Sequence, residues 1–234
     1  RYDAFAPFHE TFTTMAYLAA TTKTIKLSSG VLILPQRQTG LVAKQAAEVD
    51  LLSDGRLRLG VGVGWNHVEY EALNCEWKTR GKKQAEQIEV LRKLWTEELV
   101  TFEGHFHKYN EVTIVPSPKQ RPIPIWIGGS ADKVIKRAAK LGDGWMPILS
   151  PDKEGKTALE KLYTYLEEFG RKREGFGIEV WMRFSEDNPE VWGATADEWR
   201  SMGVDMAMLY PMWEIKGVDG QIEILSKFKE VAHS

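Results

Sequence analysis

The sequence lacks several features of membrane and secreted proteins. Its only cysteine is Cys75, so no disulfide can form within these 234 residues, and no apolar run approaches the roughly 20 residues that a transmembrane helix needs. The chain starts at Arg1 with neither an initiator methionine nor the charged and then apolar pattern of a signal peptide. We therefore expect a cytoplasmic protein and a segment upstream of Arg1 that this sequence does not contain.

The sequence also lacks a block of charge of either sign. Its 31 basic and 33 acidic residues are interspersed, and the formal net charge is −2. Neither a nucleic acid nor an anionic membrane surface is indicated as a partner, because both select dense basic patches. With 43% hydrophobic residues the chain can build a sizeable core, and a small-molecule substrate is the expected partner.

Helical and strand patterns alternate along the chain. Apolar runs predict six strands, at 25–33, 56–63, 125–127, 144–148, 178–184 and 206–210. Helical spacing falls at about 12–19, 41–52, 85–95, 134–141, 159–169 and 222–231, with a short helix after a capping box at Thr195. Segment 100–121 has short β-like runs and prolines, which indicate an inserted hairpin and loop. The alternation predicts a parallel sheet, either open and doubly wound or closed into a barrel.

Two of the predicted strands end in glycines. The run 56–67 carries Gly60, Gly62 and Gly64, a spacing that does not match the dinucleotide-binding pattern G-x-G-x-x-G. Glycines at such strand ends either relieve crowding or let a ligand approach the backbone. The run Pro124–Ser130 ends in two glycines directly before a helical pattern, so backbone N–H groups and a helix dipole can meet an anion there.

The order of these motifs resembles that of the luciferase-like monooxygenase superfamily, especially its branch that uses the deazaflavin coenzyme F420. The likeness covers nearly the whole chain. It is carried by Ile25–Arg37, Ala43–Gln45, Leu51–Trp65, Glu69–Ala72, Arg80–Gly81, Pro124–Gly129 and Leu141–Trp145.

This resemblance implies a TIM-type (β/α)8 barrel that begins here at the helix before its third strand. The first two strands, roughly 50 to 60 residues with their helices, would lie upstream. Residues 1–234 would form one domain, with the hairpin and loop at 100–121 inserted, and the protein would be a homodimer. The resemblance also implies a cis peptide between Gly30 and Val31, for which an ordinary bulge at Gly30 is the alternative.

In such a barrel the site lies at the carboxyl ends of the strands. Ser130 would bind the cofactor phosphate together with backbone N–H groups of its neighbours, or would only cap the following helix. Val63 stands where the resemblance places an arginine in FMN-using luciferases, which favours F420 over FMN. The expected cofactor-binding residues are Gly30, Val31, Gly62, Val63, Gly64, Trp65, Gly128, Gly129, Ser130 and Ala131.

His67 and Arg37 are the candidate catalytic residues. A histidine titrates near neutrality, so His67 can donate or accept a proton, unless it is only a solvated loop residue. Arg37 and Arg183 are cations for a substrate carboxylate or for the anionic tail of F420, unless they are surface arginines. Arg183 and Tyr210 are the candidate substrate residues. His105 and His107 alternate on one run without a third ligand nearby, so we expect no metal site.

Trp65 and Trp145 either line the cavity or belong to the core. The function that follows is an oxidoreductase that transfers hydride with F420, or inserts oxygen with reduced FMN, on a small organic substrate. The alternative is a flavin-binding protein of the same fold without turnover. An unrelated barrel enzyme, such as a sugar isomerase or hydrolase, ranks below both, because the strand ends carry almost no paired carboxylates or metal ligands.

Overall fold

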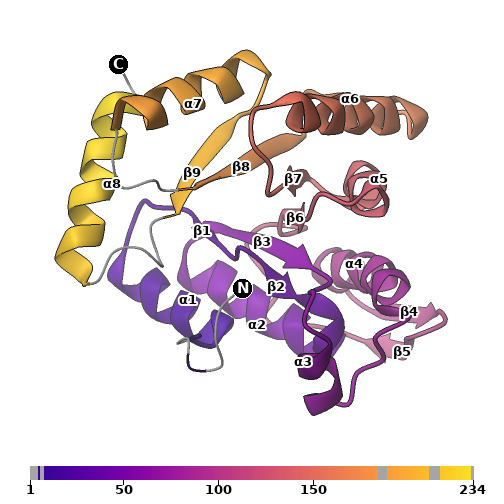
Figure 1. Cartoon of the computed structure of the whole chain (residues 1–234). Helices are drawn as coiled ribbons and strands as arrows, with labels where there is room; N and C mark the ends of the chain where they lie inside the picture. Colours follow the sequence, from indigo (N-terminus) through magenta and orange to yellow (C-terminus); the bar gives the residue numbers. More distant parts are fainter. Residues whose placement is uncertain (1–4, 6–7, 184–188, 211–216, 233–234) are drawn as a thin grey trace. The chain divides into compact units, whose positions relative to one another are not determined.

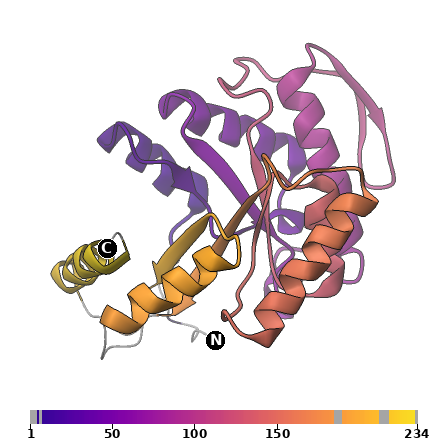
Figure 2. The same cartoon turned by 90° about the horizontal axis from the view of Figure 1, so that it is seen from above.

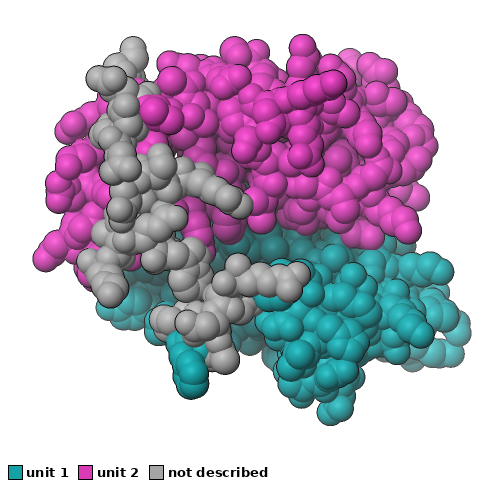
Figure 3. Space-filling view, viewed as in Figure 1, with its two compact units in different colours: residues 1–126 teal, residues 127–234 magenta. Residues whose placement is uncertain are grey.

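The protein forms two compact units, which divide after Trp126 (Figure 3). The computed structural model describes residues 5, 8–183, 189–210 and 217–232. Unit 1 covers residues 1–126 and unit 2 residues 127–234. The chain passes from one unit to the next within a strand, β6 (Ile125–Gly128).

Unit 1 begins with a helix and a small parallel sheet. The strand predicted at 25–33 is interrupted, because the peptide between Gly30 and Val31 separates its two halves. Both halves pair in parallel with the next strand, with Leu27 opposite Leu57 and Leu32 opposite Val61. The elements are α1 (Thr11–Thr21), β1 (Leu27–Ser28), β2 (Leu32–Ile33), the 3-10 helix η1 (Leu34–Gln36), α2 (Thr39–Leu52) and β3 (Leu57–Gly62).

The second half of unit 1 contains two helices and a hairpin. The short helix α3 (His67–Ala72) was not predicted, because six residues are too few to show a helical period. It is followed by α4 (Arg80–Thr96) and by an antiparallel pair, β4 (Val100–Glu103) and β5 (Lys108–Val112), inside segment 100–121.

The core of unit 1 lies where α1 and α2 meet β1 and β3 (Figure 1). The small side chains of α2 allow close approach, and the Trp95 indole N–H donates to the Ala43 carbonyl at 3.0 Å. The buried carboxylate of Asp50 accepts from Gln120 Nε2 at 2.7 Å and from its backbone N–H at 2.8 Å. These bonds hold the proline-rich segment before β6 on α2.

Unit 2 is a run of alternating strands and helices. In its sheet β6 lies beside β7 (Gly144–Met146), followed by β8 (Gly177–Arg183) and β9 (Met206–Tyr210). The last two pairs are parallel, with Trp145 opposite Ile178 and Trp181 opposite Met208. The helices are α5 (Asp132–Leu141), α6 (Lys153–Glu168), α7 (Pro189–Ser201) and α8 (Val218–Ala232). Helix α5 packs against α6, and α7 packs against α8 (Figure 2).

Helix α7 corrects one prediction. The predicted capping box at Thr195 is not a helix start, because α7 already begins at Pro189. The Thr195 hydroxyl instead donates to the carbonyl of Val191, one turn earlier, at 2.7 Å. A capping motif is a short pattern that also occurs within helices, so it does not define a terminus alone. Phe184, the predicted end of β8, lies outside the described residues.

The parallel sheet that the alternation predicted is confirmed. In the described ranges, no helix is both long enough and apolar enough to cross a membrane.

Candidate cofactor site

The glycines at the end of β3 are covered by side chains from β2 and from the residue directly before it. A Cβ built on Gly62 would lie 2.6 Å from Val31 Cγ2, and one on Gly64 would lie 3.1 Å from Ile33 Cγ2. The cis peptide implied by the resemblance is present between Gly30 and Val31. Five of the predicted cofactor residues are therefore neighbours in unit 1: Gly30 and Val31 lie between β1 and β2, and Gly62, Val63 and Gly64 lie at the carboxyl end of β3.

Tyr70 fixes the chain directly after β3. Its buried side chain donates from the hydroxyl to the Val63 carbonyl at 2.7 Å, and its ring meets the edge of Trp77 at 5.1 Å between centroids. Burial raises the pKa of Tyr70 to about 12, so the hydroxyl keeps its proton at neutral pH. The sequence pointed to this residue only through the motif Glu69–Ala72, and its role was not predicted.

Glu69 links this segment to the loop after β2. Its carboxylate accepts from Asn66 Nδ2 at 3.0 Å and from Gln36 Nε2 at 3.2 Å. Asn66 is also the N-cap of α3, accepting from the Val68 N–H at 3.2 Å. A short helix is thus fixed at its start by a cap and on its side by a neighbouring loop.

His67 lies at the first position of α3, and its side chain is about half exposed. Its Nδ1 lies 3.1 Å from Glu71 Oε1, and its ring meets the edge of Trp77. A carboxylate beside Nδ1 favours a proton there and leaves Nε2 as the nitrogen that can exchange a proton with a ligand. Trp65, two residues earlier, is 50% exposed and so belongs to the surface of the site, not to the core.

Arg37 is paired within unit 1. Its Nη1 lies 2.8 Å from Glu10 Oε1, and its guanidinium lies 5.8 Å from the centroid of the Phe12 ring. The pairing with Thr13 and Arg37 outweighs the effect of burial, which acts in the opposite direction, and the pKa of Glu10 is lowered. A cavity of about 380 Å³ adjoins this pair, lined by Glu10, Gln36, Arg37, Gln38, Leu41, Val42, Gln45 and Leu73.

The other predicted glycine turn, after β6, is held by β7. The Gly129 N–H donates to the Met146 carbonyl at 3.1 Å, and the indole N–H of the fully buried Trp145 donates to the Gly129 carbonyl at 2.8 Å. Gly129 has a φ of +119°, a conformation that is essentially restricted to glycine. Trp145 is therefore a core residue that shapes the turn.

Ser130 does not cap α5, contrary to one of the sequence-based interpretations. Its hydroxyl accepts from the Ile148 N–H at 3.2 Å and lies 3.3 Å from the Ile148 carbonyl. The N-cap of α5 is Ala131, which has no side chain for capping. The N-cap residue of α5 therefore gives no side-chain cap to the first N–H groups of the helix, which is the arrangement that suits an anion.

A cavity of about 460 Å³ adjoins this turn in unit 2. Its lining places side chains of both charges near Ser130. Lys161 Nζ lies 3.2 Å from Asp132 Oδ1, and Lys153 and Glu154 lie at the start of α6. The remaining lining residues are Ile135, Leu149, Thr157 and Ala158.

Tyr210 stacks on Trp181 across β8 and β9, with ring centroids 5.3 Å apart and planes 29° from parallel. The Trp181 indole nitrogen is buried and has no hydrogen-bond partner in the described part of the chain. Trp181 was not predicted, since one tryptophan among nine gives no signal. Arg183 lies opposite Tyr210 in the strand register, and its side chain is outside the described residues.

The histidines of the hairpin do not gather metal ligands. Over the described ranges, no group of three or more His, Cys, Asp or Glu side chains is placed to hold a metal ion. His107 contacts Glu86 and Thr39 instead.

The chain belongs to the luciferase-like monooxygenase family, whose profile matches residues 2–207. An uncharacterized protein of Mycobacterium tuberculosis is 41% identical over 140 residues, 60% of this chain and 48% of that protein. The 5,10-methylenetetrahydromethanopterin reductase of Archaeoglobus fulgidus is 30% identical over 176 residues, which are 75% of this chain and 52% of that protein. An FMNH2-dependent dimethylsulfone monooxygenase of Pseudomonas putida is 33% identical over 139 residues, which are 58% of this chain and 38% of that protein.

The fold is shared with solved structures of the same class. The crystal structure of monooxygenase RslO1 from Streptomyces bottropensis superposes with a TM-score of 0.84 at 21% identity, covering 94% of this chain and 81% of that one. The fold class is therefore the predicted α/β fold of the TIM-barrel type. The chain spans about half the length of the curated relatives it matches.

Proposed function

We propose that this chain is part of an oxidoreductase that uses F420 to transfer hydride to or from a small organic substrate. The observation that carries the choice of cofactor is Val63, a neutral side chain at the end of β3. Family membership supports the oxidoreductase class. Relatives with either cofactor in their names support a flavin-type cofactor: the FMNH2-dependent monooxygenase of Pseudomonas putida, and an F420-dependent glucose-6-phosphate dehydrogenase of Kineococcus radiotolerans that is 32% identical over 186 residues, 74% of this chain and 53% of that protein.

The residues of unit 1 fit one face of a flat ring. The glycine backbone at the end of β3 is lined by Val31 and Ile33, so the surface is apolar, and the exposed indole of Trp65 follows it. Bound F420 would supply the hydride chemistry, while the protein binds it, orients the substrate and excludes water. In unit 2, the N–H groups of Ser130 and Ala131 and the uncapped start of α5 would bind the phosphate.

Other side chains have proposed roles toward the substrate. His67 would exchange a proton through Nε2, since Glu71 holds Nδ1. Arg37, as half of a pair with Glu10, would bind a substrate carboxylate if the pair opens. In unit 2, Tyr210 and Trp181 would form an aromatic wall, and Arg183 would supply a cation.

Two alternatives differ from this proposal in the reaction that follows cofactor binding. In one, bound reduced FMN would supply the two electrons of a monooxygenation, in which one atom of O2 enters the substrate and the other leaves as water; the name of the Pseudomonas putida relative indicates this reaction type for that protein. In the other, the protein binds a flavin without turnover, in which case the cofactor binds and no substrate or reductant changes its redox state.

The test is a pair of titrations on the full-length protein, one with F420 and one with FMN, followed by fluorescence. We expect wild type to bind F420 more tightly than FMN. The variant Val63→Arg should shift the preference toward FMN, because a guanidinium would be available to pair with its phosphate, and Val63→Leu serves as the size control. Tighter FMN binding by wild type would overturn the choice of F420.

We also propose that the protein acts as a homodimer in the cytoplasm. Large apolar side chains are exposed on both helices that cover the sheet of unit 1: Tyr17 and Leu18 on α1, and Leu41 and Leu52 on α2. A second copy would bury them. Sedimentation of the full-length protein as a monomer at micromolar concentration would contradict the dimer.

A further inference from the structure

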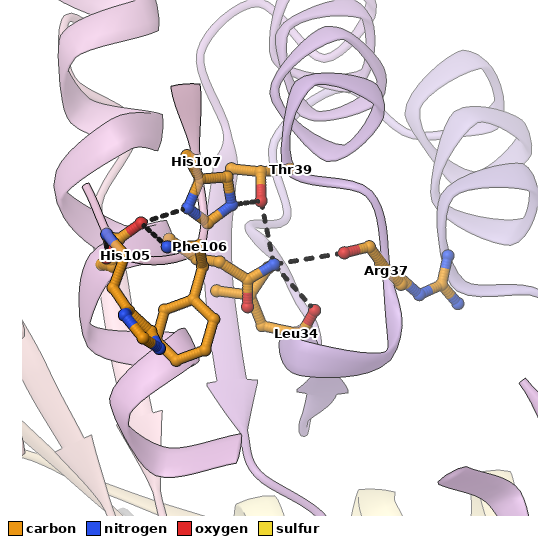
Figure 4. A network of polar contacts seen from close by, with 8 residues as sticks. Leu34, Arg37, Thr39, His105, Phe106 and His107 are labelled. Carbon is orange, nitrogen blue, oxygen red and sulfur yellow. Dashed lines mark hydrogen bonds and ion pairs between the residues drawn. The ribbon is translucent and has the colours of Figure 1, made fainter. Parts of the chain in front are cut away.

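The loop after β2 is held by side chains of α4 (Figure 4). Gln87 Nε2 donates to the Leu34 carbonyl at 3.2 Å and to the Arg37 carbonyl at 3.1 Å. Lys83 Nζ donates to the Pro35 carbonyl at 2.9 Å. Three carbonyls of one short loop thus receive their hydrogen bonds from a helix more than 40 residues away in the sequence.

This attachment continues from Gln87 into the hairpin β4–β5. Gln87 Nε2 also lies 3.0 Å from the hydroxyl of Thr39, the first residue of α2. The same hydroxyl lies 2.6 Å from His107 Nε2 (Figure 4). On the other side of the ring, His107 Nδ1 lies 2.8 Å from Glu86 Oε1. The chain of contacts is buried, since the side chains of His107 and Glu86 are only 8% and 14% exposed.

Donors and acceptors can be assigned from Glu86 through His107 to Thr39, and the two hydrogens of Gln87 Nε2 are shared among three acceptors. Burial alone would raise the pKa of Glu86, but hydrogen bonds from His107 and from the N–H groups of Phe106 and His105 outweigh it, so the pKa is lowered. Glu86 is therefore an acceptor, and His107 Nδ1 donates to it. In the tautomer with its single ring proton on Nδ1, Nε2 accepts from the Thr39 hydroxyl, whose oxygen accepts from Gln87.

We propose that His107 is a positioning residue for the cofactor site, which fixes the loop Leu34–Arg37 through Thr39 and Gln87. The inference rests on the proposed function, because β2 connects this loop to the expected ring-binding residue Val31: Val31 directly precedes the strand and the loop directly follows it. The hairpin β4–β5 is then a functional insertion: it supplies the imidazole that completes the attachment of the loop to α4.

A simpler role for the same residues is to anchor the hairpin alone. Glu86 accepts from the N–H groups of His105 at 2.9 Å and Phe106 at 2.8 Å, independently of the His107 ring. The two roles differ at Thr39: an anchor for the hairpin does not need its hydroxyl, whereas positioning of the loop does.

The test compares His107→Asn with His105→Asn, a matched control on the same hairpin, whose ring contacts the Phe106 ring. The first readout needs no cofactor: hydrogen exchange of the peptide covering residues 34–42, which includes the Arg37 N–H bonded to Leu34. We expect exchange about 3- to 10-fold faster in His107→Asn and unchanged in His105→Asn. Thr39→Val should match His107→Asn, and Thr39→Ser should restore wild-type exchange.

The second readout is the affinity for F420 and for FMN, which should fall about 3- to 10-fold in His107→Asn and Thr39→Val only. Unchanged exchange at 34–42 in a folded His107→Asn variant would overturn the inference. Faster exchange with unchanged affinity would overturn the link to the cofactor and leave the proposed function intact. Binding of neither cofactor by wild type would overturn the proposed function and that link together, while the exchange data still decide whether His107 holds the loop.

Discussion

The two strands that end in glycines, β3 and β6, differ in what holds the backbone at the strand end. At the end of β3 the neighbouring elements cover the backbone: Val31 lies on Gly62, and the Tyr70 hydroxyl binds the Val63 carbonyl. At the end of β6 the backbone is held by β7: the Gly129 N–H donates to the Met146 carbonyl, and the Gly129 carbonyl accepts from the Trp145 indole N–H.

The difference shows that a glycine can be required by space or by conformation. Gly62 has no room for a Cβ, which would lie 2.6 Å from Val31. Gly129 has room, since its nearest neighbour would be Val134 Cγ1 at 3.4 Å, but its φ of +119° excludes other residues. Neither fact alone implies a ligand, so the cofactor proposal depends on binding measurements.

The largest effect on the free energy of unfolding is expected from a comparison of Trp145, next to the β6 turn, with Trp65, next to the end of β3. Trp145→Ala should lower the free energy of unfolding by about 3–5 kcal/mol, because it empties a fully buried site. Trp65→Ala should change it by less than about 0.5 kcal/mol, because that side chain is half exposed. Urea denaturation of both variants checks the pair, and equal losses would show that Trp65 is part of the core.

A second experiment separates the two kinds of glycine. Gly62→Ala and Gly129→Ala should each cost about 1–3 kcal/mol, the first by overpacking and the second by backbone strain. Adding Val31→Ala should recover most of the loss at Gly62, whereas adding Val134→Ala should recover nothing at Gly129.

Double-mutant cycles from urea denaturation measure this coupling. A coupling near zero between positions 31 and 62 would contradict the crowding explanation. A large coupling between positions 129 and 134 would show that space, and not φ, requires the glycine of the β6 turn.

The last expected effect concerns the hydrogen bond that the Tyr70 hydroxyl donates to the Val63 carbonyl. The pKa of this phenol is about 12 in the folded chain, against 10.0 for an unperturbed tyrosine. The unfolded chain therefore loses the proton first, and the stabilisation present below pH 10 is lost as the pH rises through 12, by at most about 1.4 kcal/mol per pH unit. The difference in unfolding free energy between wild type and Tyr70→Phe, measured from pH 8 to 12, should decrease with pH. A constant difference would contradict the burial of the phenol.

Part of the site could be predicted and part could not. The ordered motifs pointed to the family, to the cis peptide at Gly30 and to the glycine turns. The partners of the predicted side chains were not accessible: Arg37 is paired with Glu10, and Ser130 bonds Ile148 instead of capping α5. Whether these residues bind a cofactor stays a prediction.

The sequence by itself determined the alternation of strands and helices, because periodicity and turn residues act over a few neighbours and survive in any context. It did not determine the start of α7, because the capping-box pattern at Thr195 also occurs within a helix. Only the tertiary structure brought His107 to Thr39, which lies 68 residues away. Such contacts depend on how helices and hairpins pack, and no local pattern encodes that packing.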